Sequence, residues 1–161
     1  MKFSVVMSVY IKDNDFFLQK SLESLVLQTL LPDEIILVAD GALKNSLYKV
    51  ISNYRHRYDF IKFISYEENK GPAYAWNIAI ENSRNDWIAR MDADDVCFPE
   101  RFEKQIKYMK KENLDICGGD FVIINNNNAF IEHVKVPKTK SEIILTMGFN
   151  VPFAHPSVMI K

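Results

Sequence analysis

Short apolar runs alternate with amphipathic helical patterns along the first two thirds of this chain, and this alternation limits its fold more than any other feature. Four runs are rich in Val, Ile and other apolar side chains and are typical of buried strands: residues 3–9, 35–38, 61–66 and 87–91. Between them the apolar residues recur at the spacing of one helical face. Strands that alternate with helices favour an α/β fold built on a parallel sheet.

The first helical pattern shows how these segments are bounded. Leu18, Leu22, Leu25 and Thr29 lie on one face of this helix. The cluster Asp13-Asn14-Asp15 offers side chains that cap a helix N-terminus, and Pro32 is expected to stop the helix. Three more helices are expected over residues 47–58, 72–82 and 99–109.

The last third of the chain carries strand signals in three stretches: residues 114–124, 129–136 and 152–161. The run Asn125–Asn128 is expected to form a turn between the first two. Thr139 and Glu142 have the spacing of a capping box, which predicts a short helix.

Composition excludes several classes of protein. An apolar content of 48% excludes wholesale disorder. The 20 Lys and Arg residues against 21 Asp and Glu give a net charge of −1, which argues against bulk affinity for nucleic acid. Because 161 residues without an internal repeat or linker fit one folding unit, we expect a single domain over residues 1–161.

The cysteine count and the apolar runs indicate the compartment. Cys97 and Cys117 are too few for a disulfide scaffold or a zinc site, so free thiols in a reducing compartment are expected. The N-terminus lacks a signal-peptide pattern, and no run approaches the ~18 apolar residues of a membrane span. We therefore expect a cytoplasmic protein with no transmembrane segment in this chain.

Polar residues follow three of the expected strands. Tyr10 ends the first strand, Asp40-Gly41 follows the second, and Asp92-Ala93-Asp94-Asp95 follows the fourth. In open α/β sheets, ligands bind beyond the carboxyl ends of the strands. A parallel sheet would therefore bring these residues to one polar edge, which is the candidate binding site.

The acidic string is the sharpest of these signals. In an extended chain residues i and i+2 point the same way, so Asp92 and Asp94 can face one cleft. Two adjacent carboxylates repel each other, and Mg²⁺ or Mn²⁺ is the partner that oxygen ligands favour. A solvated acidic turn, with Asp95 as a cap, is the ordinary alternative. The buried strand Trp87–Met91 directly before the string favours a functional site.

The other candidate residues have weaker signals. Tyr10 can stack on a planar base, and Asp40 can accept a hydrogen bond from a base N–H, but a half-buried Tyr and an Asp-Gly turn are both common. The segment Asn69–Pro72 opens a helix whose free N–H groups can approach an anion, although capping alone explains it.

The order and spacing of these motifs resemble one known family. Phe3–Tyr10, Asp33–Gly41, Glu68–Ala73 and Trp87–Asp95 occur in the order found in family 2 glycosyltransferases, which are inverting enzymes of the GT-A fold. Residues 99–105 and 155–159 resemble the bacterial polysaccharide-synthesis branch. The resemblance covers most of residues 2–160. It implies a Rossmann-like, mostly parallel sheet flanked by helices, a UDP-sugar donor and Mn²⁺ or Mg²⁺. It also implies a saccharide or lipid-linked saccharide acceptor, with peripheral association at the inner membrane face as an open alternative.

The resemblance also carries roles to individual positions. Tyr10 and Asp40 would contact the base, Asp92 the nucleoside, and Asp94 the metal that bridges the diphosphate. The nucleotide-sugar site implied in this way consists of Val9, Tyr10, Asp40, Asn69, Lys70, Gly71, Asn77, Asp92, Ala93 and Asp94. The implied metal ligands are Asp94, Asp92 and His155, of which His155 also has an ordinary structural reading before Pro156.

Three positions depart from the family pattern. Ser8 stands where Pro is frequent, Ala39 replaces an Asp, and Trp76 stands where an Arg is common. The lost Arg would approach the base or the diphosphate, and Arg90 or Lys70 is the candidate to compensate for it.

The catalytic base is not assigned to any residue of this sequence. In the family the base is an Asp or Glu in the acceptor half, usually after the His-Pro-Ser region, and the sequence shows no convincing Glu-Asp pair after residue 142. We therefore expect the base to lie beyond Lys161, in which case this chain is a truncated form or the donor-binding half of a longer enzyme.

Two alternatives stay open: a sugar-1-phosphate nucleotidyltransferase, and a nucleotide-sugar-binding module without catalysis. The first would need a Gly-rich, basic phosphate loop after the first strand. It is disfavoured because residues 8–15 contain no Gly and only Lys12 as a cation. A receiver-type signalling domain would need its acidic cluster after the first strand, whereas here the cluster follows the fourth.

Overall fold

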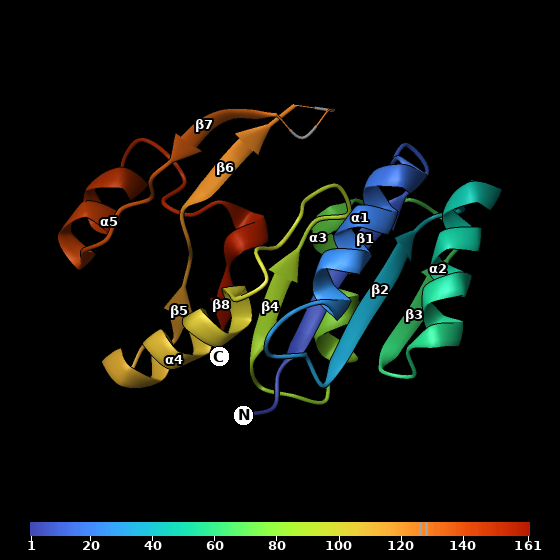
Figure 1. Ribbon diagram of the computed structural model, residues 1–161, viewed down its shortest axis with the longest axis horizontal. Helices are drawn as coiled ribbons and strands as arrows, with labels where there is room; N and C mark the ends of the chain where they lie inside the picture. The colour runs from blue at the N-terminus through green and yellow to red at the C-terminus, as the bar shows by residue number, and fades with distance from the viewer. Residues whose placement is uncertain (126, 128) are drawn as a thin grey trace.

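The computed structural model describes residues 1–125, 127 and 129–161. Two sheets are present in this part of the chain (Figure 1). The larger has six strands in the order β3-β2-β1-β4-β8-β5, and the smaller is the pair β6-β7. The bounds of the larger sheet are β3 Ile61–Tyr66, β2 Glu34–Asp40, β1 Ser4–Tyr10, β4 Ile88–Met91, β8 Met159–Ile160 and β5 Ile116–Cys117.

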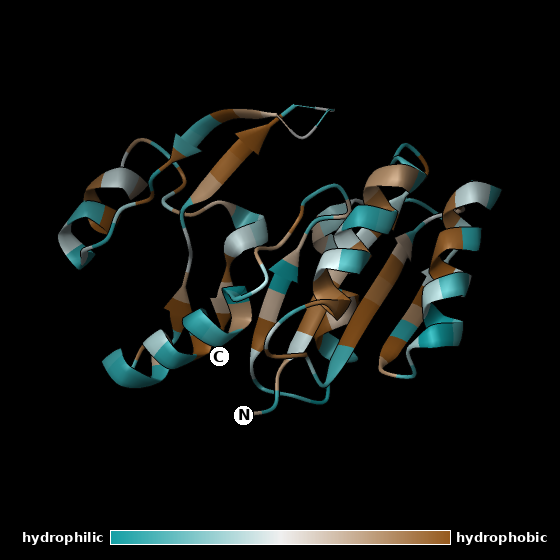
Figure 2. Cartoon of the chain, viewed as in Figure 1, coloured by the Kyte–Doolittle hydropathy of each residue, from teal (hydrophilic) through white to brown (hydrophobic). Residues whose placement is uncertain are grey.

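The first four strands form the parallel core that the sequence predicts. β1 pairs in parallel with both β2 and β4, and β2 pairs in parallel with β3. All seven residues of β2 are buried, as expected for a strand covered on both faces. Figure 2 shows the same strands as mainly hydrophobic ribbons between helices with hydrophilic outer faces. The α/β prediction is therefore confirmed.

Helices cover both faces of this sheet. α1 (Asp15–Val26), α2 (Asn45–Arg57) and α4 (Arg101–Glu112) supply buried residues to one apolar cluster, together with Phe3 and Met7. α3 (Pro72–Glu81) packs through Ala75 and Ala79 on the opposite face. In Figure 1, α1 and α2 lie in front of the strands and α3 lies behind them.

The first helix ends earlier than its apolar pattern predicts. Asn14 caps it, since its Oδ1 accepts hydrogen bonds from the backbone of Phe16 and Phe17. The helix stops at Val26, well before Pro32. Thr29 therefore lies outside it, where its backbone N–H donates to the Pro99 carbonyl over 2.8 Å. A long-range contact has replaced the expected last helical turn.

The predicted strand over residues 114–124 is wrong as a single element. It is divided into β5 in the large sheet and β6 (Phe121–Ile124) in the small one. The break falls at Gly118-Gly119, where a Cβ on Gly118 would lie 2.5 Å from Cδ1 of Phe153. The ring of Phe153 thus occupies the space that a side chain in a continuous strand would need.

The rest of the C-terminal third differs in a similar way. The expected strand over 129–136 is β7 (Phe130–Val134), and the expected capping box of α5 (Lys140–Met147) is confirmed. The stretch 152–161 is mostly irregular: it contains a 3₁₀ helix, η1 (His155–Ser157), and the short β8, which runs antiparallel to β4 and β5. Lys161 follows β8, and its backbone N–H donates to the Asp115 carbonyl over 2.9 Å, beside β5.

The turn expected at Asn125–Asn128 lies partly outside the described residues, because Asn126 and Asn128 are not among them. Oδ1 of Asn125 accepts hydrogen bonds from the backbone N–H groups of Asn127 and Ala129. In the described part of the chain, none of the helices combines the length and the apolar character needed to cross a membrane.

Candidate functional site

A cleft of about 670 Å³ lies at the carboxyl edge of the parallel strands. It is where the sequence argument places the site, because Tyr10 stands beside Asp40 in the register of β1 and β2, and β4 runs parallel to β1 on the other side. The cleft is lined by Ser8, Tyr10, Ile11, Lys12, Asp13, Asp40, Asn69, Pro72, Trp76, Arg90, Asp92, Ala93 and Asp94.

Asp40 fastens the end of β2 to the loop that opens α3. Its buried carboxylate accepts at Oδ1 from the Tyr66 hydroxyl over 2.8 Å and from the Lys70 backbone N–H over 2.7 Å. Nδ2 of Asn69 donates to the Asp40 carbonyl. Burial raises the pKa of Tyr66, and its hydrogen bond to Asp40 raises it further. Gly41, at φ 83°, allows the close approach, because a Cβ there would lie 2.9 Å from the Asn69 nitrogen.

The acidic string forms the loop directly after β4. The Ser21 hydroxyl donates to the Asp92 carbonyl over 2.9 Å and so ties the loop to α1. Burial raises the pKa of Asp92 while the Arg90 charge lowers it. Burial and the charges of Asp92 and Asp94 raise the pKa of Asp95 to about 6. The α4 helix begins at Arg101, with Glu100 as its N-cap residue, so Asp95 does not cap it.

A fourth carboxylate in the cleft, that of Asp13, was not predicted from the sequence. Oδ2 of Asp13 accepts from the Tyr10 backbone N–H over 2.9 Å. Burial raises the pKa of Asp13 to about 6 against the lowering effect of that hydrogen bond, and the Asp94 and Asp92 charges raise it as well. Asp13 lies in the loop after the first strand as Asp94 lies in the loop after the fourth, but the Asp-Asn-Asp pattern around it indicates a helix cap.

Two positions that depart from the family pattern touch each other. The indole Nε1 of Trp76 donates to Oγ of Ser8 over 3.0 Å. The Arg90 guanidinium carbon lies 3.7 Å from the centroid of the Trp76 ring, and its Nη2 lies 2.8 Å from Oδ1 of Asp92. The third departure has no such contact: Ala39 is buried in the apolar cluster of the sheet rather than in the cleft lining.

The structure brings together six of the predicted site residues as cleft lining: Tyr10, Asp40, Asn69, Asp92, Ala93 and Asp94. The other predicted positions lie outside that lining. Val9 is in the apolar core and Asn77 is exposed on α3. Lys70 and Gly71 belong to the loop before α3, and Lys70 reaches Asp40 through its backbone. His155 is exposed in η1, with its ring 6.5 Å from that of Trp76.

The expected position of the catalytic base, beyond Lys161, stays a prediction. Lys161 is joined by its backbone to Asp115 at the β5 edge of the sheet and does not line the cleft. The carboxylates that do line the cleft are Asp13, Asp40, Asp92 and Asp94. Each of these belongs to the end of a strand or to the loop after it, so the cleft takes all its carboxylates from one edge of the sheet.

The carboxylates in the cleft fit a hard divalent cation in part. Within the described residues, no group of three or more His, Cys, Asp or Glu side chains is arranged to hold a metal. The acidic loop supplies Asp94, which is exposed, and Asp92, which already pairs with Arg90. One or two carboxylates are what Mg²⁺ takes when substrate phosphates complete its coordination. The two carboxylates Asp92 and Asp94 therefore fit an ion whose remaining ligands include diphosphate oxygens.

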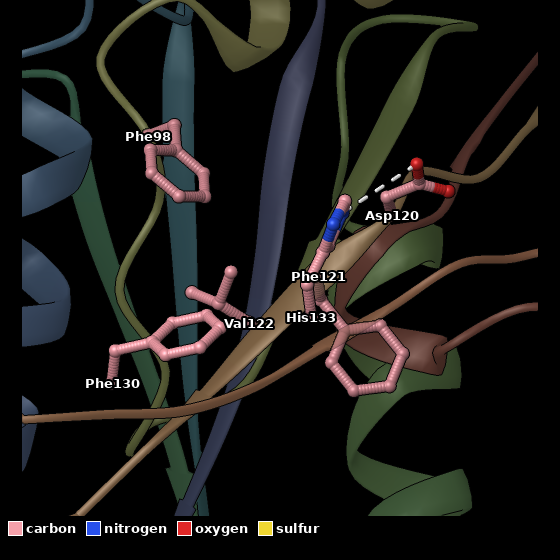
Figure 3. Close-up of a pocket in the computed structure, with 6 residues that line it drawn as sticks. All are labelled: Phe98, Asp120, Phe121, Val122, Phe130 and His133. Atoms are coloured by element: carbon pink, nitrogen blue, oxygen red, sulfur yellow. Dashed lines mark ion pairs between the residues drawn. The ribbon is translucent and has the colours of Figure 1, made fainter.

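A second cavity, of about 410 Å³, lies between the β6-β7 pair and the loop that carries Phe98 (Figure 3). Its lining is mainly aromatic and aliphatic, with one polar pair, His133 and Asp120, whose Nε2 and Oδ2 are 3.7 Å apart. Lys138 and the backbone N–H of Val136 lower the pKa of Asp120. No predicted site residue lines this cavity.

The sequence profile described as "Glycosyl transferase family 2" matches residues 4–160. The chain is 35% identical to the amylovoran biosynthesis glycosyltransferase AmsE of Erwinia amylovora, over 99% of this chain and 59% of the relative. It is 34% identical to the UDP-Gal:alpha-D-GlcNAc-diphosphoundecaprenol beta-1,3-galactosyltransferase of Escherichia coli, over 99% of this chain and 58% of the relative. The chain thus spans less than two thirds of the length of these relatives.

Solved structures share the fold. Staphylococcus aureus TarS 1-349 in complex with UDP-GlcNAc superposes on 99% of this chain and 45% of its own, with a TM-score of 0.73 at 21% identity. The mannosyltransferase PcManGT of Pyrobaculum calidifontis, in complex with GDP-Man and Mn²⁺, covers 79% of this chain and 36% of its own, with a TM-score of 0.64 at 14% identity. These likenesses identify the fold as GT-A.

Proposed function

The chain belongs to glycosyl transferase family 2, and on that premise we propose that it binds a nucleotide diphosphate sugar, with UDP as the nucleotide, for transfer of the sugar to a hydroxyl of a saccharide acceptor. The observation that carries the proposal is the cleft itself. Tyr10, Asp40 and the acidic pair Asp92 and Asp94 come from the ends of three parallel strands and line one cavity.

Each of these residues has a role that its geometry allows. Tyr10 is 41% exposed at the rim, so its ring is available to stack on the base. Asp40 is held by Tyr66 and Lys70 through Oδ1, which leaves Oδ2 to accept from a base N–H. Asp92 would accept from the nucleoside, in the orientation that its pair with Arg90 imposes.

Asp94, with Asp92 beside it, would hold Mn²⁺ or Mg²⁺, and we keep His155 as a weaker candidate because its ring lies against Trp76. Such an ion, when bound, neutralises the negative charge that grows on the leaving diphosphate. The carboxylates orient the donor for that step. Transfer with inversion then needs a carboxylate base on the opposite face of the sugar.

We propose that this base belongs to the acceptor half of the full-length protein, beyond Lys161. The names of two relatives support the wider assignment: AmsE acts in amylovoran biosynthesis, and the E. coli enzyme takes UDP-Gal and a lipid-linked diphospho-sugar. A cell-surface polysaccharide or its lipid-linked precursor is accordingly the acceptor class we propose, with the enzyme at the inner face of the membrane.

Thermal denaturation with a panel of nucleotides tests the donor proposal. UDP with Mn²⁺ should raise the melting temperature more than UDP alone, and more than GDP or ADP with Mn²⁺, because binding to the native state stabilises it by RT ln(1 + [L]/Kd). Equal shifts for all three nucleotides would contradict the choice of UDP. No shift with any of them would contradict the nucleotide site.

The binding-module alternative is tested with the full-length protein. Transfer or hydrolysis of a UDP-sugar would exclude it, whereas tight UDP-sugar binding without turnover would favour it. One observation weakens this alternative. Ala39, where an Asp was expected, is fully buried in the core, so its small side chain removes no carboxylate from the cleft lining.

A further inference from the structure

The Arg90 side chain occupies an unusual position in the wall of the cleft. It comes from β4, is 15% exposed, and pairs through Nη2 with Oδ1 of Asp92 over 2.8 Å. Its guanidinium carbon lies 3.7 Å from the Trp76 ring centroid, close enough for a strong cation–π contact. The cation is therefore held on two sides, by a carboxylate and by an aromatic face.

The same guanidinium has hydrogen-bonding capacity that the described residues do not use. Its Nε and Nη1 are buried and have no hydrogen-bond partner in the described part of the chain. An unpartnered buried N–H costs free energy, and such groups in a folded protein call for an explanation. An anionic oxygen brought into the cleft would supply the missing acceptor.

Trp76 is itself held in place by a third element. Its indole Nε1 donates to Oγ of Ser8 over 3.0 Å, so α3, β1 and β4 meet at this ring. The hydrogen bond fixes the edge of the indole, and the fixed ring in turn limits where the Arg90 guanidinium can lie. Removal of the ring would leave the guanidinium free to move while its charge stayed in the cleft wall.

We propose that Arg90 is a binding residue for the diphosphate of the donor and that Trp76, anchored by Ser8, is the residue that positions it; this rests on the proposed nucleotide-sugar function. Arg matches the geometry of phosphate oxygens and can keep one N–H on Asp92 while offering another. Nε and Nη1 are buried, so a phosphate oxygen cannot reach them in their present position. The guanidinium therefore shifts along the Trp76 ring when the diphosphate binds.

Lys70 is the rival cation, and its contacts disfavour it. Its Nζ lies 5.0 Å from the centroid of the Tyr74 ring, and Lys70 is outside the cleft lining that includes Arg90. Lys12 does line the cleft, but it is exposed in the loop after β1 and has no comparable clamp among the described contacts. Arg90 is thus the cleft cation that the described contacts already hold in position.

Calorimetry with UDP and uridine separates the diphosphate contribution from that of the base. EDTA is present throughout, so that a metal does not contribute. The variant R90Q should bind UDP about 10- to 100-fold more weakly, the range expected for a lost hydrogen bond to a charged group, while its affinity for uridine stays the same. W76L should bind UDP several-fold more weakly and uridine with unchanged affinity. W76F keeps an aromatic face and should recover most of the lost UDP affinity.

The matched control is R55Q, because the Arg55 guanidinium also lies over an aromatic ring, 5.8 Å from Phe63, but on the exposed face of α2. R55Q should bind both ligands like the unmodified chain. Circular dichroism and thermal denaturation establish that each variant is folded. If R90Q does not fold, the comparison of W76L with W76F decides: equal UDP affinity in these two variants would overturn the positioning role of the ring.

Fluorescence supplies a readout that a structural role would not change. With W87F as the background, emission comes from Trp76 alone, and saturating UDP should alter it while uridine leaves it unchanged. Unchanged UDP affinity in R90Q, or equal losses for UDP and uridine, would overturn the assignment of Arg90. Failure of the unmodified chain to bind UDP even when Mn²⁺ replaces the EDTA would overturn the proposed nucleotide site, and this inference with it.

Discussion

The Tyr66 hydroxyl donates to Oδ1 of the buried Asp40 over 2.8 Å, so the end of β3 holds the carboxylate at the end of β2 in position. This contact uses a lone pair that would otherwise need another donor inside the protein. It therefore contributes both to stability and to the orientation of Asp40 in the cleft.

The substitution Tyr66→Phe should lower the free energy of unfolding by about 1–2 kcal/mol, since it leaves a buried acceptor with one donor fewer. Urea denaturation measures the change. Tyr74→Phe is the matched control, because Tyr74 packs edge-on against the Tyr66 ring, with centroids 5.3 Å apart, and lies exposed on α3. Equal losses in the two variants would show that the hydrogen bond to Asp40 is not the cause, because only Tyr66 makes it.

The substitution Asp94→Ala should remove the part of UDP affinity that depends on Mn²⁺ and leave the fold intact. Asp94 is exposed, so its loss creates no cavity, whereas the protein keeps only Asp92 as a carboxylate of the acidic loop in the cleft lining. Calorimetry with and without Mn²⁺ should show a clear metal effect in the unmodified chain and none in the variant. Asp59→Ala, an exposed acid after α2, is the control. A metal effect that survives in Asp94→Ala would refute the assignment.

The sequence predicted the parallel core well because burial there is local. The Val- and Ile-rich runs of β1 and β2 are covered on both faces. A continuous apolar run of this kind indicates a buried strand by itself, without knowledge of the distant residues that cover it. The position of the cleft follows from the same pattern, since the carboxyl ends of parallel strands share one edge. Tyr10, Asp40, Asp92 and Asp94 were therefore found from the sequence.

The features that the sequence did not predict depend on long-range contacts. β8 contributes only Met159 and Ile160, and it lies between β4 and β5 through pairings that no local pattern specifies. The division of residues 114–124 depends on the ring of Phe153 lying against Gly118. The stacking of Arg90 on Trp76 joins β4 to α3, and nothing in either segment alone predicts it.

The buried carboxylate of Glu34 should make the stability of the protein depend on pH in the acid range. It is fully buried and pairs through Oε2 with Lys62 at 2.6 Å and Arg84 at 3.0 Å. Burial raises the pKa of Glu34, but the hydrogen bonds it accepts outweigh that effect and lower the pKa from 4.5 to about 2. The folded pKa lies below the unfolded one, so Glu34 stabilises the protein above pH 4.5, and this contribution is lost as the pH falls towards 2.

The substitution Glu34→Gln should therefore cost roughly 3 kcal/mol at neutral pH and flatten the decline in stability between pH 4.5 and pH 2. Urea denaturation at a series of pH values checks both parts. Glu23→Gln, in the exposed pair with Lys20, should change little. A decline in Glu34→Gln as steep as in the unmodified chain would assign the acid sensitivity to other carboxylates.

Asp13 has the opposite effect on the pH dependence of stability. Its folded pKa of about 6 lies above the unfolded value of 3.8, because burial and the charges of Asp94 and Asp92 disfavour its ionised form. The folded state binds the extra proton between these values, so this group makes the protein less stable as the pH rises through that range.

In the Asp13→Asn variant, the amide oxygen can still accept the hydrogen bond from the Tyr10 N–H. The variant should be more stable than the unmodified chain by about 1–2 kcal/mol at pH 7 and by little near pH 4. Denaturation midpoints at both pH values measure the difference. Asp15→Asn, exposed two residues further on, should not remove the pH dependence. A gain in Asp13→Asn that is equal at the two pH values would show that the charge of Asp13 is not its cause.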